Sequence, residues 1–237
     1  MTVALPPLTK WVKRIIVLLV VVYAVQILGT VAFGLSASEY SVHVLRRFAL
    51  YGPGLFGGAV WQPLTYGLLH STDAFGHILF NCLGLYIFGT RVEESVGEKA
   101  FLRLFVGGLL AAAAAVLGAH YLPQLLGRPI AHVPVVGASG AISAVAAVFC
   151  WLYWDQWLSF FVVQFKGKHL LLLMVALDVL RATTSQLSLS AHLGGTLFGL
   201  LWVSGYWRPD IWTLRFRRWR MKRKLSVVET PPKEWMN

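Results

Sequence analysis

The feature that most constrains the fold of this chain is an uncharged, apolar run at residues 15–35. As a helix, a run of this length crosses the roughly 30 Å hydrocarbon core of a bilayer. Hydrophobic residues make up 57% of the sequence and charged residues 13%, a balance far from that of soluble domains. We therefore expect an all-α, polytopic, integral membrane protein. Cys82 and Cys150 both lie inside apolar runs, so we expect them to be core residues rather than a disulfide.

Hydropathy predicts six membrane-spanning helices, at residues 15–35, 74–90, 104–121, 135–154, 169–182 and 188–207. The fifth is the weakest, because Lys168 and Asp178 lie beside or within it. The first resembles a signal peptide, because basic residues precede it. Its apolar run is too long, however, and Leu35-Ser36-Ala37 is a poor cleavage site, so we expect a retained anchor.

The basic residues give this bundle a direction. Lys10, Lys13 and Arg14 before the first span, and the basic segment 215–224 after the last, are both expected in the cytoplasm. Two cytoplasmic termini require an even number of spans, which supports the fifth. The basic residues then left on the outer side are Arg46, Arg47, Arg128 and Arg181.

We expect one membrane domain, at residues 15–207, between a cytoplasmic N-terminus (1–14) and a basic cytoplasmic tail (208–237). The segment 36–73 is too long for a tight turn and is expected to be an outer loop that packs on the membrane surface. The tail alternates cations with aromatic residues, which favours contact with anionic lipid rather than nucleic acid. We expect a multi-pass protein of the plasma or inner membrane.

Polar side chains inside a membrane span are costly, so each needs a reason. The second span contains His77 and Asn81, four residues apart on one helix face. The fourth contains Gly137-Ala138-Ser139-Gly140, and the sixth contains Ser190-Ala191-His192. Because these three spans all run from outside to inside, we expect their polar groups to share one depth just below the outer surface.

Small residues are expected to bring the fourth and sixth spans close enough for Ser139 to reach His192. They are Gly195 and Gly199 on the sixth span, and the pairs Gly137/Ala141 and Gly140/Ala144 on the fourth.

In this order and topology, the motifs resemble those of rhomboid proteases. The resemblance rests on His77-x3-Asn81, on Gly137-Ala138-Ser139-Gly140 and on Ala191-His192-x2-Gly195-x3-Gly199. It extends to Trp61-Gln62-Pro63-Leu64-Thr65-Tyr66 with His70 in the outer loop, and to Glu93-x3-Gly97. It implies a six-helix rhomboid-like bundle and an intramembrane serine endopeptidase. Its implied substrates are membrane proteins with a single span, cut near the outer face after a small residue.

The residues themselves point to the same chemistry. Ser139 is the expected nucleophile and His192 its general base. Neither the fourth nor the sixth span contains a carboxylate, and we expect Asp178 to pair with Arg181 on its own helix. The sequence therefore predicts a Ser/His dyad rather than a triad.

A developing oxyanion needs donors that are already in place. The side chains of His77 and Asn81 are the candidates, together with the backbone N–H of Ser139 at the start of a helix. The resemblance implies the same roles for these groups. We expect no cofactor and no metal.

Two other functions are compatible with parts of the sequence. His70, Asp73 and His77 have a spacing that could hold a metal, but this alternative leaves Ser139 and His192 without a role. The other alternative is a catalytically weak or inactive rhomboid-like factor that binds or traffics membrane proteins. Rhomboid folds of that kind lack the Ser/His pair, whereas this chain keeps it.

One position departs from the resemblance. It implies an aromatic ring four residues after the nucleophile, packed against the catalytic histidine, but Ser143 stands there. We therefore expect a loosely held His192 and weak activity, since orientation is a large part of catalysis. Ser143→Phe or Ser143→Tyr is then expected to raise kcat if the pocket has room.

Overall fold

The computed structural model describes residues 7–34, 37–125, 127, 133–160, 163–181, 186–205 and 221. The chain divides into two compact units, Met1–Val203 and Ser204–Asn237. The first unit contains all of the described residues except Ser204, Gly205 and Met221. The basic segment 215–224, for which we predict lipid contact, lies outside the described residues except for Met221.

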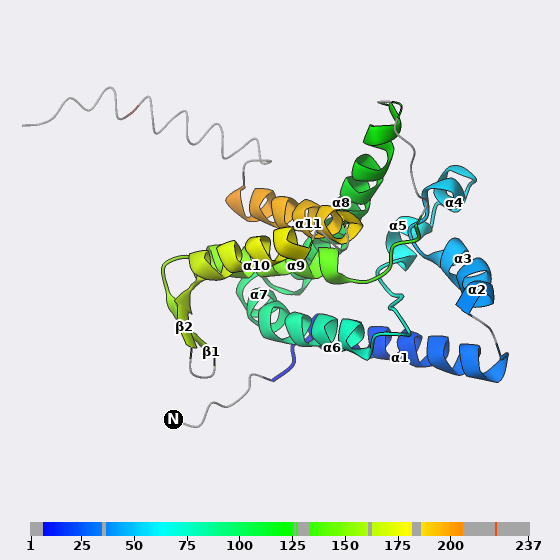
Figure 1. Cartoon of the computed structure of the whole chain (residues 1–237). Helices are drawn as coiled ribbons and strands as arrows, with labels where there is room; N and C mark the ends of the chain where they lie inside the picture. The colour runs from blue at the N-terminus through cyan, green and yellow to red at the C-terminus, as the bar shows by residue number, and fades with distance from the viewer. Residues whose placement is uncertain are drawn as a thin grey trace, which may run out of the picture. The chain divides into compact units, whose positions relative to one another are not determined.

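Long helices dominate the first unit (Figure 1). They are α1 (Lys10–Ala32), α6 (Phe75–Gly84), α8 (Glu98–Leu125), α9 (Ser139–Leu152), α10 (Gly167–Arg181) and α11 (Gln186–Ser204). A π-helical stretch at Leu85–Gly89 joins α6 to α7 (Thr90–Val96) without a break. Each of the six predicted spans overlaps one of these helices.

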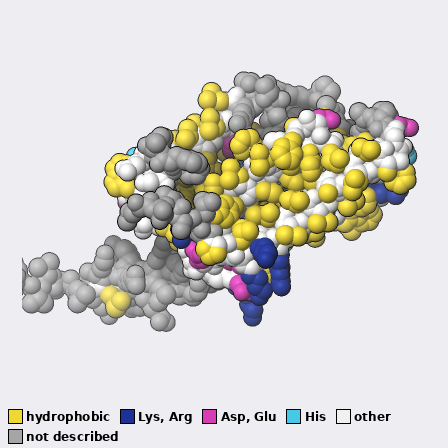
Figure 2. Space-filling model, turned by 90° about the horizontal axis from the view of Figure 1, so that it is seen from below, with side chains coloured by type: hydrophobic (Ala, Val, Ile, Leu, Met, Phe, Trp, Pro, Cys, Tyr) yellow, Lys and Arg dark blue, Asp and Glu magenta, His cyan; other side chains and the backbone are white. Residues whose placement is uncertain are grey.

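Two of the described helices are long and apolar enough to cross a membrane, at Lys10–Ala32 and Glu98–Leu122. Two shorter apolar helices cover Ser139–Leu152 and Leu189–Ser204. Large apolar side chains are exposed along α1, α6 and α10, and hydrophobic side chains cover much of the described part of the face seen in Figure 2, with Lys and Arg mainly at its margins. A surface of this kind suits contact with lipid rather than with water.

α9 lies at the centre of the packing. Every residue from Gly140 to Cys150 is buried. The reason lies in its sequence, because Gly, Ala and Ser leave room for neighbouring backbones to approach. On α8, a side chain at Gly108 would overlap Ala144 of α9. The predicted fourth span began at residue 135, whereas the helix begins at Ser139.

The segment 37–73, which we predict to lie on the outer side and call the outer loop, contains several short helices. They are α2 (Ala37–Tyr40), a π-helical turn (Ser41–Leu45), α3 (Arg46–Phe48), α4 (Gly52–Phe56) and α5 (Gln62–Thr65). A single bridge pairs Leu50 with Val135, just before α9. The loop therefore packs on the helices near the start of α9.

A β-hairpin that hydropathy did not predict connects α9 to α10. Its strands β1 (Trp157–Phe160) and β2 (Val163–Lys166) are antiparallel, with Trp157 opposite Lys166. Beside it, Lys168 donates to Asp155 at 2.7 Å and lowers the pKa of that carboxyl. Lys166 lies over the ring of Trp157, 5.2 Å from its centre.

Candidate functional site

The site begins at the turn that leads into α9. Gly137 has a φ of 116°, a conformation that residues with a Cβ rarely adopt. Its N–H donates to the carbonyl of Tyr66 in the outer loop, at 2.9 Å. A Cβ at this position would lie 2.7 Å from Nε2 of His77. Glycine at 137 thus lets the turn pass against His77 and place Ser139 at the first position of α9.

Ser139 and His192 are hydrogen-bonded across two helices. Oγ of Ser139 lies 2.9 Å from Nε2 of His192 on α11. The short reach of a serine requires closely packed backbones. A side chain at Gly195 would overlap the carbonyl of Gly140, and one at Gly199 would overlap the carbonyl of Ala144.

Asp178 on α10 is a further neighbour of His192, which the predicted Ser/His dyad does not include. Its Oδ1 lies 2.7 Å from Nδ1 of His192, and both side chains are largely buried, at 15% and 20% exposed. The sequence predicts Arg181, on the same helix, as the partner of Asp178; the side chain of Arg181 lies outside the described ones, so that pairing stays a prediction. Helical spacing gave no signal for the contact with His192, because it reveals neighbours within one helix; in the structure Met174 and Asp178, four residues apart on α10, both line the cavity beside Ser139.

His77 and Asn81 lie on α6 at the same cavity. The amide of Asn81 donates one hydrogen to the carbonyl of His77, at 2.8 Å, which leaves its second N–H available. A Cβ added to Gly137 would lie 2.7 Å from Nε2 of His77 and 3.9 Å from Oγ of Ser139. The outer edge of the His77 ring therefore faces the same small space as the Ser139 hydroxyl.

These side chains border one cavity of about 620 Å³, which we call the Ser139 cavity. Its polar residues include Ser139, Ser143, His192, Asp178, His77 and Asn81. Its apolar wall includes Phe80 and Phe88 from the α6 side and Met174 and Leu177 from α10. The combination of a wide apolar wall and a few convergent polar groups is typical of a binding and reaction site.

His70, from the outer loop, packs edge to face against His77, with 5.1 Å between ring centres. Burial, aided by the nearby His77, lowers the pKa of His70 to about 4, so the ring is neutral at pH 7. Among the described residues, no three His, Cys, Asp or Glu side chains lie close enough to hold a metal ion. The predicted alternative of His70, Asp73 and His77 therefore has no assembled ligand set in this part of the chain.

The outer-loop motif acts as a structural anchor for the site. Gln62 is fully buried, accepts from the N–H of Tyr51 and donates to the carbonyl of Arg46. Tyr66 donates its hydroxyl to the carbonyl of Leu109 on α8, at 2.8 Å. Since the carbonyl of Tyr66 also holds Gly137, these bonds fix the turn before Ser139.

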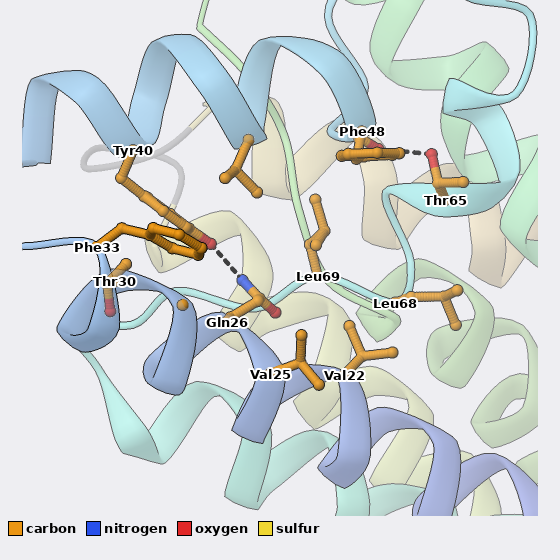
Figure 3. Close-up of a pocket in the computed structure, with 12 residues that line it drawn as sticks. Val22, Val25, Gln26, Thr30, Phe33, Tyr40, Phe48, Thr65, Leu68 and Leu69 are labelled. Atoms are coloured by element: carbon orange, nitrogen blue, oxygen red, sulfur yellow. Dashed lines mark hydrogen bonds between the residues drawn. The ribbon is translucent and has the colours of Figure 1, made fainter. Parts of the chain in front are cut away.

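A second cavity, of about 460 Å³, lies between α1 and the outer loop (Figure 3). Val22, Val25 and Leu69 point into it, and Gln26 donates to the hydroxyl of Tyr40 at its edge. No nucleophile with an adjacent base lines this cavity. Of these two cavities, the Ser139 cavity is the one lined by a serine beside a histidine.

Comparison with known proteins agrees with the motifs. The sequence model of the rhomboid domain family matches residues 57–209, well over half of the chain. The mitochondrial RHOMBOID-like protein 12 of Arabidopsis thaliana is 34% identical over 148 residues, 54% of this chain and 44% of that protein.

Two further relatives are similar over comparable lengths. The mitochondrial presenilin-associated rhomboid-like protein A of Danio rerio is 28% identical over 165 residues, 66% of this chain and 41% of that protein. Rhomboid protease AarA of Providencia stuartii is 28% identical over 169 residues, 62% of this chain and 59% of that protein. The chain thus spans about half the length of these relatives. Its domain match and its assembled Ser139–His192 site lead to one conclusion: the chain belongs to the rhomboid family of helical integral membrane proteins.

Proposed function

We propose that this protein is an intramembrane serine endopeptidase that hydrolyses peptide bonds in or near the membrane spans of other proteins. The observation that carries the proposal is the 2.9 Å hydrogen bond between Ser139 Oγ and His192 Nε2 at the wall of a cavity. A serine hydroxyl is a poor nucleophile unless a base accepts its proton as it attacks. Membership of a family with named proteases supports the same activity.

In the first half of the reaction, Ser139 Oγ attacks the carbonyl carbon of the substrate while its proton passes to His192 Nε2. The tetrahedral intermediate then collapses, and His192 gives this proton to the leaving amine as the C–N bond breaks. The remaining acyl group is an ester of Ser139. Water attacks the ester with His192 again as base, which releases the acid and restores the hydroxyl.

The oxyanion formed at each attack needs donors in a site with little water. The ring of His77 and the free amide hydrogen of Asn81 are placed on the same cavity wall, and the N–H of Ser139 lies at the N-terminal end of α9. The positive end of the helix dipole favours negative charge at this point. We assign these three groups to the oxyanion hole.

The proposed substrates are single-span membrane proteins, cut near the outer face after a small residue. A helical peptide bond in lipid is shielded until its backbone finds other partners, so cleavage requires local unwinding. We further propose that the tail 208–237 contacts anionic lipid and that the protein resides in a plasma or inner membrane. The relatives from Arabidopsis thaliana and Danio rerio carry mitochondrial names, so fractionation of the host's membranes is the test of location.

The decisive experiment combines a fluorophosphonate probe with cleavage of a single-span reporter. Ser139→Ala is expected to abolish both probe labelling and cleavage, and His192→Ala to reduce both by about 10³-fold or more. The matched controls are Ser95→Ala and His43→Ala, which alter exposed residues away from the cavity and should leave both rates unchanged.

Cleavage that persists in Ser139→Ala would overturn the serine mechanism and favour a metal, which chelators would then test. A wild-type protein that neither reacts with the probe nor cleaves any reporter would favour the alternative of a membrane-protein binding or trafficking factor.

A further inference from the structure

Both ring nitrogens of His192 have partners, and the two partners differ in kind. Nε2 faces the hydroxyl of Ser139 at 2.9 Å, and Nδ1 faces the carboxylate of Asp178 at 2.7 Å. An ionised carboxylate has no proton to donate. In this hydrogen bond Nδ1 of His192 is therefore the donor. The lone pair of the neutral imidazole is then on Nε2, where it can accept from Ser139.

We propose that Asp178 is the positioning residue of this site: it holds His192 in the Nδ1–H tautomer and orientation that serine activation needs. The inference rests on the proposed function and adds a third residue to it. When His192 takes the proton of Ser139 it becomes a cation, and the adjacent carboxylate stabilises that charge in a place where water is scarce.

The burial of Asp178 in an apolar helix supports a role for its contact with His192. A carboxylate within an apolar helix is costly and is tolerated where it has a partner or a role. Asp178 is 15% exposed, and the side chain it faces is the base of the site. Ser143, one turn after the nucleophile, lines the same cavity but has no ring to stack. Asp178 therefore supplies the orientation that an aromatic ring at 143 would otherwise give.

The test compares Asp178→Asn, Asp178→Ala and Asp178→Glu, with Asp155→Asn as the matched control on an exposed acid outside the site. Asparagine keeps the shape of aspartate, but its amide can donate to Nδ1 and so favour the wrong tautomer. The same change in soluble Ser-His-Asp proteases costs about 10⁴ in kcat. We expect Asp178→Asn to lower kcat and the fluorophosphonate rate by about 10²-fold or more with KM little changed. Asp178→Glu should recover part of the loss, and Asp155→Asn should match the wild type.

The order of the variants separates positioning from packing. If Asp178 only fills space, the isosteric asparagine would be harmless and alanine the worse change, and that order would overturn the inference. Asparagine as damaging as alanine, or more so, supports it.

A second readout does not depend on proteolysis. The ¹⁵N shifts of His192, identified by comparison with His192→Gln, report which ring nitrogen carries the hydrogen. We expect Nδ1–H in the wild type and its loss in Asp178→Asn. That change in a protein that cleaves nothing would support the inference while overturning the proposed function. The same tautomer in both proteins would overturn the inference, even in an active protease.

Discussion

At the scale of single residues, Ser143 and Asp178 both line the Ser139 cavity, and Asp178 contacts His192. Ser143 is 7% exposed and borders the Ser139 cavity. From the sequence, a serine at this position predicts a loosely held His192 and a gain in kcat from Ser143→Phe. The carboxylate at 2.7 Å from Nδ1 changes that expectation, because His192 already has an anchor.

We now expect Ser143→Phe to change kcat by less than about twofold in the wild type, but to raise it several-fold in the Asp178→Asn background. The reason is that an aromatic ring at position 143 helps only when the orientation of His192 has been lost. Turnover of a reporter at equal expression measures both effects, with Ser143→Leu as a control that adds apolar volume without a ring. An equal gain in both backgrounds would mean that Asp178 leaves His192 loose.

The residues of the site differ in how readily the sequence identifies them. Ser139, His77, Asn81 and His192 stand out because each is polar within an apolar span and near the same end of it. Their shared depth was predicted from topology, and all of them border one cavity. Asp178 was assigned to its own helix, because helical spacing reveals neighbours within a helix but not those across α10 and α11.

At the scale of elements, the start of α1 depends on a distant side chain. Thr9 gives this helix no side-chain cap of its own. Instead the buried Glu93, on α7, accepts hydrogen bonds from the Thr9 hydroxyl and from the N–H groups of Trp11 and Val12. These N–H groups have no partner within the helix, and the carboxylate also suits the positive end of its dipole.

We expect Glu93→Ala to destabilise the protein by about 2–4 kcal/mol, since it leaves buried donors without partners. In a chain of this size that loss lowers Tm by roughly 4–16 °C, which thermal unfolding in detergent would measure. The control is Glu94→Ala, which removes an exposed ion pair with Arg91 and should cost less than about 1 kcal/mol. Equal shifts for the two variants would contradict the capping role.

Hydropathy located the long helices better than the segments between them. Apolar runs of this length have few structures open to them in lipid, so helices could be expected at each. The hairpin at Trp157–Phe160 and Val163–Lys166 and the short helices of the outer loop carry no such signal. The hairpin depends on local pairs such as Trp157 with Lys166, and the short helices on contacts within the loop such as Gln62 with the carbonyl of Arg46, and composition reveals neither.

At the scale of the whole molecule, the charge pattern predicts six spans with both termini in the cytoplasm. In a chain without Cys82 and Cys150, a cysteine placed at the exposed Val60 of the outer loop should react with an impermeant maleimide in intact cells. A cysteine in place of the exposed Asp155 should react only after the membrane is opened. Labelling of the 215–224 segment from outside would overturn this topology.

The backbone contacts between α9 and α11 have a consequence for how the bilayer acts on the protein. Gly140 lies against Gly195, and Ala144 against Gly199, with no side chain between them that could change rotamer. A contact of this kind resists lateral pressure, so the spacing of nucleophile and base should be insensitive to lipid thickness or fluidity. The cavity's other walls carry side chains that can change rotamer, such as Met174 and Leu177. If the protein is the protease proposed above, lipid composition is then expected to set how often a substrate enters and to leave the rate of the chemical step unchanged.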